Sequence, residues 1–162
     1  MSISMSNDIR LQYDKSFATL RSIVEAFPKE KWLVPHSDIY YIPSRIAYHL
    51  AVFISKHLNS GFLDPNFNNS LPFGIWIEAT AETLPSKEEF LSYYDEIVEK
   101  SIASLALLND EALKDPVESE RSWFGESQLG VHTYCIREIA AHTGELNKML
   151  IENGLEDIWV FR

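Results

Sequence analysis

The sequence has a single cysteine, few glycines and prolines, and no long apolar run. Because Cys135 has no second cysteine to pair with in the chain, no intramolecular disulfide can form, and we expect a reducing compartment such as the cytoplasm. No window approaches ~18 consecutive apolar residues, which a membrane-spanning helix needs. The first residues, MSISMSNDIR, lack the basic and apolar regions of a secretory signal. These absences predict a cytoplasmic protein that does not enter a membrane.

Positive charge is also scarce. The chain has 14 Lys and Arg residues against 24 Asp and Glu residues, for a formal net charge of -10. A nucleic-acid backbone or an anionic membrane surface would be repelled at long range. We therefore expect neither nucleic acid nor membrane among the partners of this protein.

Most sequence motifs of the common enzyme classes are missing. The chain has no G-x-G-x-x-G, P-loop, H-E-x-x-H, C-x-x-C or G-x-S-x-G motif. A di-iron bundle requires Glu-x-x-His on two helices, whereas this chain has one related pair, Glu138 and His142, with one residue too many between them. Nucleotide-binding, zincin, dithiol and α/β-hydrolase chemistries are disfavoured.

The residues that are present indicate one all-α domain over residues 1–162. Hydrophobic residues make up 46% of the sequence, enough for a sizeable core in a chain of this length. Apolar positions recur at steps of three and four, the period of an amphipathic helix, and no strand pattern competes. Four helices are predicted: from Ser6 to the residue before Pro28, from Pro43 to Leu58, from the capping box Ser86–Glu89 to about Leu108, and from Glu126 or Ser127 to Asn153. This pattern is typical of a helical bundle, which can hold a ligand or metal between facing helices.

A long connection separates the second and third predicted helices. Residues 61–85 contain three prolines, yet also Phe62, Phe67, Phe73 and Trp76, so the segment is too apolar for a solvated linker. We expect it to fold over the helices, either as a lid on a pocket or as a dimer contact.

Glu138 and His142 are the most informative pair of polar residues. Residues four apart on a helix lie about 40° apart around its axis and one turn apart along it, so both side chains can reach one ion. His142 shares the apolar stripe of its helix and should face the core, whereas Glu138 lies at the edge of that stripe, where a carboxylate needs a cation, a donor or water. His49 lies on the flank of the apolar face of the second helix and also points inward. Two histidines and one carboxylate form the ligand set of catalytic zinc and non-haem iron sites.

Other interpretations of these residues stay open at this point. A core-facing histidine is more often a hydrogen-bonded packing residue than a ligand, and helical spacing does not show that His49 and His142 meet. His57 and His132 are spare ligand candidates, Cys135 is a soft ligand or a small core residue, and Glu145 is a general base, a group that orients His142, or a solvated side chain. His36 is expected to face solvent. The four tryptophans are expected to pack in the core or loops, with Trp76 or Trp123 as an alternative wall of a pocket.

The chain resembles the DinB/YfiT-like superfamily over nearly its full length. Four stretches in the order of that family carry the resemblance: FPKEKWLVP, IPSRIAYHLAVFISKHL, LPSKEEFLSYYDEI and REIAAHTGELNKMLIENG. The second stretch places His49 where the family has its first metal histidine. Many relatives have histidine at the position of Glu138 and glutamine at that of Glu145, but a branch that resembles mycothiol-dependent enzymes has Glu-x-x-x-His-x-Gly, as Glu138, His142 and Gly144 do here.

The resemblance implies a four-helix bundle of the DinB/YfiT type, often a homodimer, with one divalent ion on His49, Glu138 and His142. Zinc, nickel, iron and manganese are the candidates. Our leading hypothesis is a metal-dependent enzyme acting on a small molecule, a low-molecular-weight thiol S-transferase or a hydrolase, in which the ion lowers the pKa of a thiol or water. The alternative is a metal-free or structural bundle that binds a small ligand or a protein, with Glu138 hydrogen-bonded.

Overall fold

A computed structural model describes residues 4–36, 41–59 and 61–159 of the chain. Within these ranges the protein is helical and contains no β-strand; an isolated antiparallel bridge joins Pro116 and Ser127. The four long helices are α1 (Met5–Ala26), α2 (Pro43–Leu58), α3 (Lys87–Ala106) and α4 (Gln128–Glu152). Short 3₁₀ turns lie between them: η1 (Lys29–Lys31), η2 (Gly61–Leu63), η3 (Phe67–Ser70), η4 (Ala112–Lys114) and η5 (Ser119–Phe124). The predicted all-α class is confirmed.

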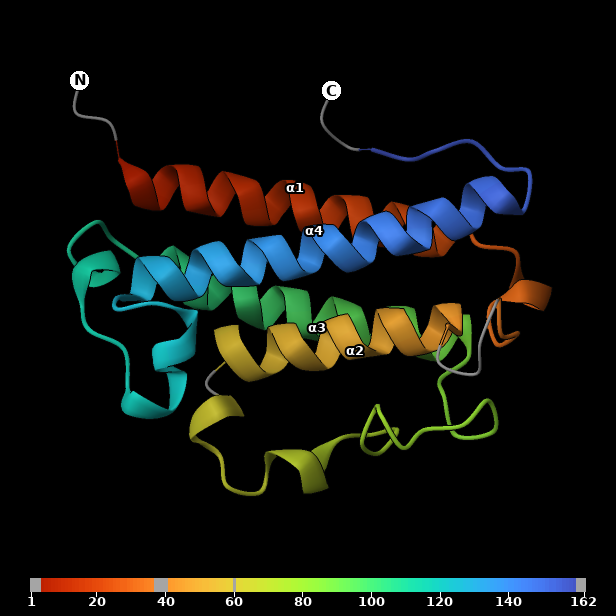
Figure 1. The fold of residues 1–162 in the computed structure, drawn as a ribbon, viewed down its shortest axis with the longest axis horizontal. Helices are drawn as coiled ribbons and strands as arrows, with labels where there is room; N and C mark the ends of the chain where they lie inside the picture. Colours follow the sequence, from red (N-terminus) through yellow and green to blue (C-terminus); the bar gives the residue numbers. More distant parts are fainter. Residues whose placement is uncertain (1–3, 37–40, 60, 160–162) are drawn as a thin grey trace.

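The four long helices lie side by side, and each packs against two others (Figure 1). Helix α1 contacts α3 and α4, and α2 also contacts α3 and α4. The chain runs in one direction along α1 and α4 and in the opposite direction along α2 and α3. Because α2 and α3 are parallel, the connection between them has to return along the length of the helices, and it does so on the outside of α2.

The buried stripes agree closely with the helical periodicity. The 3.6-residue period predicts one apolar stripe on α3, and all of its positions are buried: Phe90, Tyr94, Ile97, Ser101 and Leu105. The stripes of the other three helices are also buried except for partly exposed side chains at Ile9, Phe53, His57 and His142. The main core gathers residues from all four helices, among them the following fully buried side chains: Tyr13, Leu20, Ile23, Leu50, Ile54, Phe90, Tyr94 and Ile139. The hydroxyl of Tyr94 donates a hydrogen bond to the carbonyl oxygen of Phe17 at 3.0 Å, which satisfies its polar atom inside this core.

The start of α1 differs from the prediction. The sequence predicts a helix that starts at Ser6, but the helix begins at Met5, and Ser4 is its N-cap. The cause is a tertiary contact: the Asp110 carboxylate accepts hydrogen bonds from the Ser6 amide at 2.8 Å and from the Ser4 hydroxyl at 3.1 Å. Asp110 lies in the connection after α3. Its carboxylate accepts from a backbone N–H group at the start of α1 that has no partner within the helix.

The bounds of the other helices follow the predictions more closely. Helix α2 has the predicted bounds, and α3 ends at Ala106, slightly before the expected Leu108. The capping box before α3 is confirmed, since the Ser86 hydroxyl accepts from the Glu89 amide and the Glu89 carboxylate accepts from the Ser86 amide. Helix α4 ends at Glu152 and is followed by Gly154 with a φ of 80°, the left-handed conformation that favours glycine after a helix.

The segment between α2 and α3 folds over α2, as predicted. Its anchor is Arg45, whose guanidinium donates hydrogen bonds to the carbonyl oxygens of Trp76, at 3.3 Å, Ile77, at 3.0 Å, and Ala79. A second apolar cluster forms between this segment and α2: Ile42, Tyr48, Val52, Phe67, Ala79 and Leu84. The segment therefore has a core of its own and holds Trp76 in a defined position against the helices.

No helix among the described residues combines sufficient length with sufficient apolar character to cross a bilayer.

Candidate metal centre

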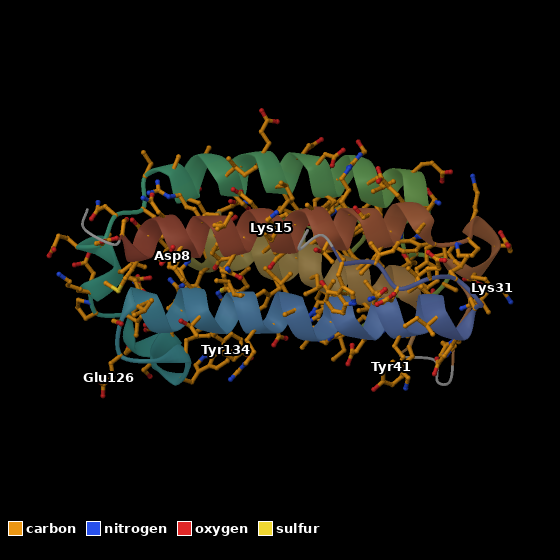
Figure 2. The ribbon with its side chains drawn as sticks, turned by 90° about the horizontal axis from the view of Figure 1, so that it is seen from above. Asp8, Lys15, Lys31, Tyr41, Glu126 and Tyr134 are labelled. Carbon is orange, nitrogen blue, oxygen red and sulfur yellow. The ribbon has the colours of Figure 1, made fainter. Side chains whose placement is uncertain are left out.

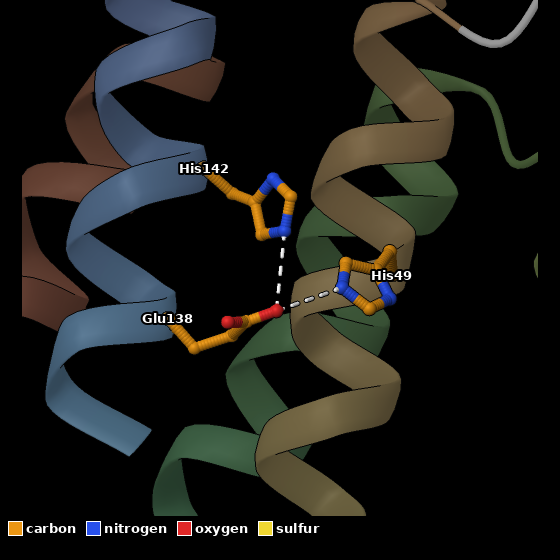
Figure 3. Close-up of side chains that lie close together, drawn as sticks. All are labelled: His49, Glu138 and His142. Atoms are coloured by element: carbon orange, nitrogen blue, oxygen red, sulfur yellow. Dashed lines mark ion pairs between the residues drawn. The ribbon is translucent and has the colours of Figure 1, made fainter. Parts of the chain in front are cut away.

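The structure brings His49, Glu138 and His142 together between two helices (Figure 3). His49 comes from α2, whereas Glu138 and His142 lie one turn apart on α4, which runs antiparallel to α2. One donor atom from each side chain lies within 4.8 Å of the others, so the group could hold a metal ion. The three side chains are 16, 22 and 26% exposed, respectively, which leaves the cluster largely desolvated but reachable by a small solute.

One carboxylate oxygen lies at the centre of this group. Oε1 of Glu138 is 3.5 Å from Nε2 of His49 and 3.3 Å from Nε2 of His142. Two donors bound to one tetrahedral ion at ~2.1 Å lie about 3.4 Å apart, so both spacings match those around a single ion. A neutral imidazole nitrogen and a carboxylate oxygen are also donor types that zinc and the other first-row divalent metals accept. The residues present therefore fit a divalent ion.

Glu145 contributes the next contact outward from the cluster. Its Oε2 lies 2.7 Å from Nδ1 of His142, on the same face of α4 because the two residues are three positions apart. A carboxylate at Nδ1 holds the proton on that nitrogen and leaves the lone pair of Nε2 directed at Glu138. This contact is the one expected if Glu145 orients His142.

His49 is held differently, by packing. Its ring lies 4.2 Å from the Trp76 ring and 6.4 Å from the Phe53 ring, centroid to centroid. Its Nδ1 is buried and has no hydrogen-bond partner within the described ranges. Burial lowers the pKa of His49, the charge of His142 lowers it further, and Glu138 opposes both effects. The lowered pKa favours the neutral form of His49, whose lone pair a metal ion requires.

A first cavity opens at one end of the cluster, which we call the Arg45 cavity. Its volume is about 390 Å³, within the range of small-molecule sites. It is lined by residues of α2, α4 and the covering segment: Tyr41, Arg45, Ile46, His49, Trp76, Glu138, His142 and Glu145. All three cluster residues reach it, so a small molecule bound here would contact them directly.

A second cavity, which we call the Trp123 cavity, opens at the other end of the cluster. It has a volume of about 360 Å³, and its lining includes Phe53, Lys56, His57, Asn68, Trp123 and Tyr134. It shares His49, Trp76 and Glu138 with the Arg45 cavity, so the cluster lies where the two meet. Figure 2 shows Tyr41 and Tyr134, one from each cavity, on the α4 side of the molecule at separate points along its length. Trp76 and Trp123 both line the Trp123 cavity, so their alternative predicted role as pocket walls is confirmed.

The spare histidine ligands lie outside the cluster. His57 packs against Phe53, with ring centroids 4.5 Å apart, and lines the Trp123 cavity. His132 faces α1, where its Nδ1 is 3.0 Å from the Tyr13 hydroxyl. Nε2 of His36 contacts the carboxylate of Glu152 near the end of α4. None of these histidines belongs to the His49, Glu138 and His142 group found among the described residues.

Cys135 also lies outside the cluster. It is buried in the main core, where burial raises the pKa of its thiol to about 12. A thiol that stays protonated at neutral pH is a poor metal ligand and a poor nucleophile. Of its two predicted roles, the structure supports the small core residue.

Two residues near the cluster were not identified from sequence. Arg45 precedes His49 by four positions, so helical spacing alone places both on one face of α2, and this signal could have found it. Tyr41 lines the same cavity from the residues just before α2, where no periodic pattern applies. Its position depends on how the connection before α2 folds.

No protein-family model matches the chain, and no curated protein sequence matches it.

Proposed function

We propose that this protein is a metal-dependent enzyme of the DinB/YfiT-like superfamily, a four-helix bundle that binds one divalent ion on His49, Glu138 and His142. The expected reaction is transfer of a low-molecular-weight thiol to an electrophile, or a related hydrolysis. The expected assembly is a homodimer. The family assignment rests on the four sequence stretches that resemble the family, in their order along the chain.

One observation carries the proposal of a metal enzyme. Nε2 atoms from two different helices converge on the same oxygen of Glu138, at 3.5 and 3.3 Å, next to cavities large enough for a substrate. Three protein ligands with space beside them are the arrangement of a catalytic rather than a structural site, because a position is left for substrate or water. The convergence of these donors supports the ligand set that the resemblance implies.

The chain's own residues account for the remaining requirements of the reaction. When bound, a divalent ion supplies the positive charge that lowers the pKa of a thiol or water beside it. Glu145 holds His142 with Nε2 inward, and Trp76 covers His49 and restricts water at the cluster. In a transfer to a chlorinated aromatic compound, the thiol sulfur bonds to the ring carbon, chloride leaves with the electron pair of the broken bond, and the thiol proton passes to water.

Metal analysis of protein purified without a histidine tag tests the ligand set. We expect about one equivalent of metal in the wild type and its loss in His49→Ala, Glu138→Ala and His142→Ala, because a site with two remaining ligands binds far more weakly. His36→Ala and Glu99→Ala are matched controls that remove the same groups elsewhere, and both should keep the metal. Stoichiometric metal in all three cluster variants would overturn the proposed site.

A turnover assay tests the activity separately. The metal-loaded protein is incubated with a panel of low-molecular-weight thiols and 1-chloro-2,4-dinitrobenzene, and thioether formation is followed by absorbance. We expect turnover in the wild type that disappears in the three cluster variants. A metal-loaded protein that gives no turnover with any thiol would contradict the transferase proposal while leaving the metal site standing.

A second candidate, a metal-free binding module, is favoured by a specific feature of the cluster. With no ion present, Nε2 of His49 at 3.5 Å and Nε2 of His142 at 3.3 Å can each donate to Oε1 of Glu138 if they carry a proton, and the carboxylate is then satisfied. A wild-type protein that takes up no divalent metal at micromolar concentrations would favour this candidate.

A further inference from the structure

The Trp123 cavity has the chemical character of a ligand-binding site that extends away from the metal cluster, with His49 and Glu138 at one end. Trp123 is 64% exposed although it is a large aromatic residue. Its ring stacks on Phe124, with centroids 3.7 Å apart, and meets the edge of Tyr134 at 5.1 Å. An indole that is held in place and yet left open to solvent offers a rigid apolar surface, which a flat ligand can cover at little cost in conformational entropy.

The charged side chains around this cavity are balanced in sign, unlike the excess of carboxylates in the protein as a whole. Lys56 lines the cavity, is half-buried, and forms no ion pair or hydrogen bond within the described ranges. The guanidinium of Arg137 lies 4.5 Å from the ring of Tyr134, which forms part of the wall. Among the described residues of the lining, Glu138 is the one carboxylate, and it is engaged by His49 and His142. In a protein of net charge -10, an unpaired lysine in a cavity favours an anionic ligand.

The length of the ligand follows from the helix. Lys56 and His49 are seven residues apart on α2, which corresponds to about 10 Å along the helix axis. Aromatic side chains line the cavity between these two ends, with Phe53 from α2 and Tyr134 from α4. A ligand with one or two aromatic rings therefore spans from Lys56 to the cluster, and a volume of about 360 Å³ accommodates it.

We propose that the Trp123 cavity binds a small aromatic compound with one negative charge, such as an aromatic carboxylate, with its ring against Trp123 and its anionic group at Lys56. The far edge of the ring reaches His49 and Glu138. This inference deepens the proposed function, because it names the class of the electrophilic substrate, and it rests on that function for the reaction although not for the binding.

Calorimetric titration with three probes of one shape tests this assignment: 2-naphthoate, the neutral 2-naphthylmethanol and the cationic 2-naphthylmethylammonium. We expect saturable one-to-one binding of naphthoate, weaker binding of the alcohol, and the weakest binding of the ammonium compound. Lys56→Met should lower the affinity for naphthoate about tenfold and the affinity for the alcohol less than about twofold. The substitution removes a charge-assisted contact that only the anion makes. Trp123→Ala should lower the affinities for naphthoate and for the alcohol about fivefold or more, because the stacking on the indole is lost.

Matched controls keep this test specific. Lys100→Met makes the same change on α3, away from the cavity, and should leave all affinities unchanged. Far-UV circular dichroism and thermal unfolding verify that each variant is folded. Raising the salt concentration should weaken naphthoate binding to the wild type more than to Lys56→Met, because only the wild type has the ion pair to screen. Absence of saturable naphthoate binding, equal affinity for the cation, or indifference to both substitutions would overturn the proposal.

The same titration separates this inference from the proposed function. It is performed on metal-loaded protein and on protein treated with a chelator. Naphthoate binding without metal uptake or thiol transfer would contradict the proposed function and support the assignment of the cavity. Metal uptake and thiol transfer without naphthoate binding would overturn the assignment of the cavity alone.

Discussion

The Nδ1 atom of His142 lies 2.7 Å from Oε2 of Glu145. The carboxylate takes up one nitrogen of the imidazole and leaves the other, Nε2, directed into the space between α2 and α4. Partners of this kind fix the tautomer and the ring orientation of a metal-binding histidine. His49 has no such partner for its Nδ1 among the described residues, so its orientation depends on packing against Trp76.

The first prediction concerns Glu145 as the residue that positions His142. Glu145→Ala should weaken divalent-metal affinity about tenfold or more with unchanged stoichiometry, because His142 loses the contact that orients it. The metal affinity of Glu145→Gln should stay closer to that of the wild type, since the amide oxygen can still accept from Nδ1 of His142. Competition with a chromogenic chelator measures these affinities, and Glu99→Ala serves as the control. Equal affinities for Glu145→Ala and the wild type would show that Glu145 has no positioning role.

The second prediction concerns Arg45 as the anchor of the covering segment. Arg45→Met removes the hydrogen bonds to the carbonyl oxygens of Trp76, Ile77 and Ala79, so this part of the segment should open more often. Hydrogen exchange should then be faster at the amides of Glu78 and Ala79, which bond to the carbonyl oxygen of Ile75. Arg10→Met, an equivalent change on α1, should leave these amides unaffected. Unchanged exchange in Arg45→Met would mean that the apolar cluster alone holds the segment.

The third prediction is a pH dependence of stability that arises at His132. Burial, together with the charge of Arg121, lowers the pKa of His132 to about 4, whereas an unfolded histidine has a pKa of about 6.5. As the pH falls from about 6.5 towards 4, the unfolded chain binds a proton that the folded chain does not, so the free energy of unfolding decreases, by up to about 3 kcal/mol. Above about pH 6.5 this residue contributes no pH dependence.

Replacing the histidine tests this dependence directly. His132→Gln keeps an acceptor for the Tyr13 hydroxyl but cannot bind the proton. In urea unfolding between pH 7 and 4.5, the variant should therefore lose less stability than the wild type on acidification. Parallel curves for the two proteins would exclude His132 as a source of acid sensitivity.

The fourth prediction concerns the capping box of α3. Ser86→Ala removes the hydroxyl that accepts from the Glu89 amide and should lower the free energy of unfolding by about 1 kcal/mol. Ser104→Ala, at an exposed position near the other end of α3, should change it by less than about 0.5 kcal/mol. Chemical denaturation of the three proteins gives the comparison. A loss of equal size in both variants would indicate that the effect is not one of capping.

Much of the fold could be predicted from the sequence because helices are governed by local rules. The buried positions of α3 follow from the 3.6-residue period, and its start follows from Ser86 and Glu89, three residues apart. The pairing of Glu138 with His142 has the same origin, since a spacing of four places two side chains on one face of any helix. These features need no knowledge of the neighbouring helices.

Only the tertiary structure decided which helix faces that pair. Periodicity gives the direction of a side chain around its own helix but not the order or direction of the helices, so the approach of His49 to Glu138 followed from packing α2 antiparallel to α4. The cap of α1 by Asp110 and the cover of His49 by Trp76 arise in the same way, from contacts between distant parts of the chain. Local sequence determines helices and the faces they bury, whereas the candidate site lies between two helices and exists only once long-range packing has joined them.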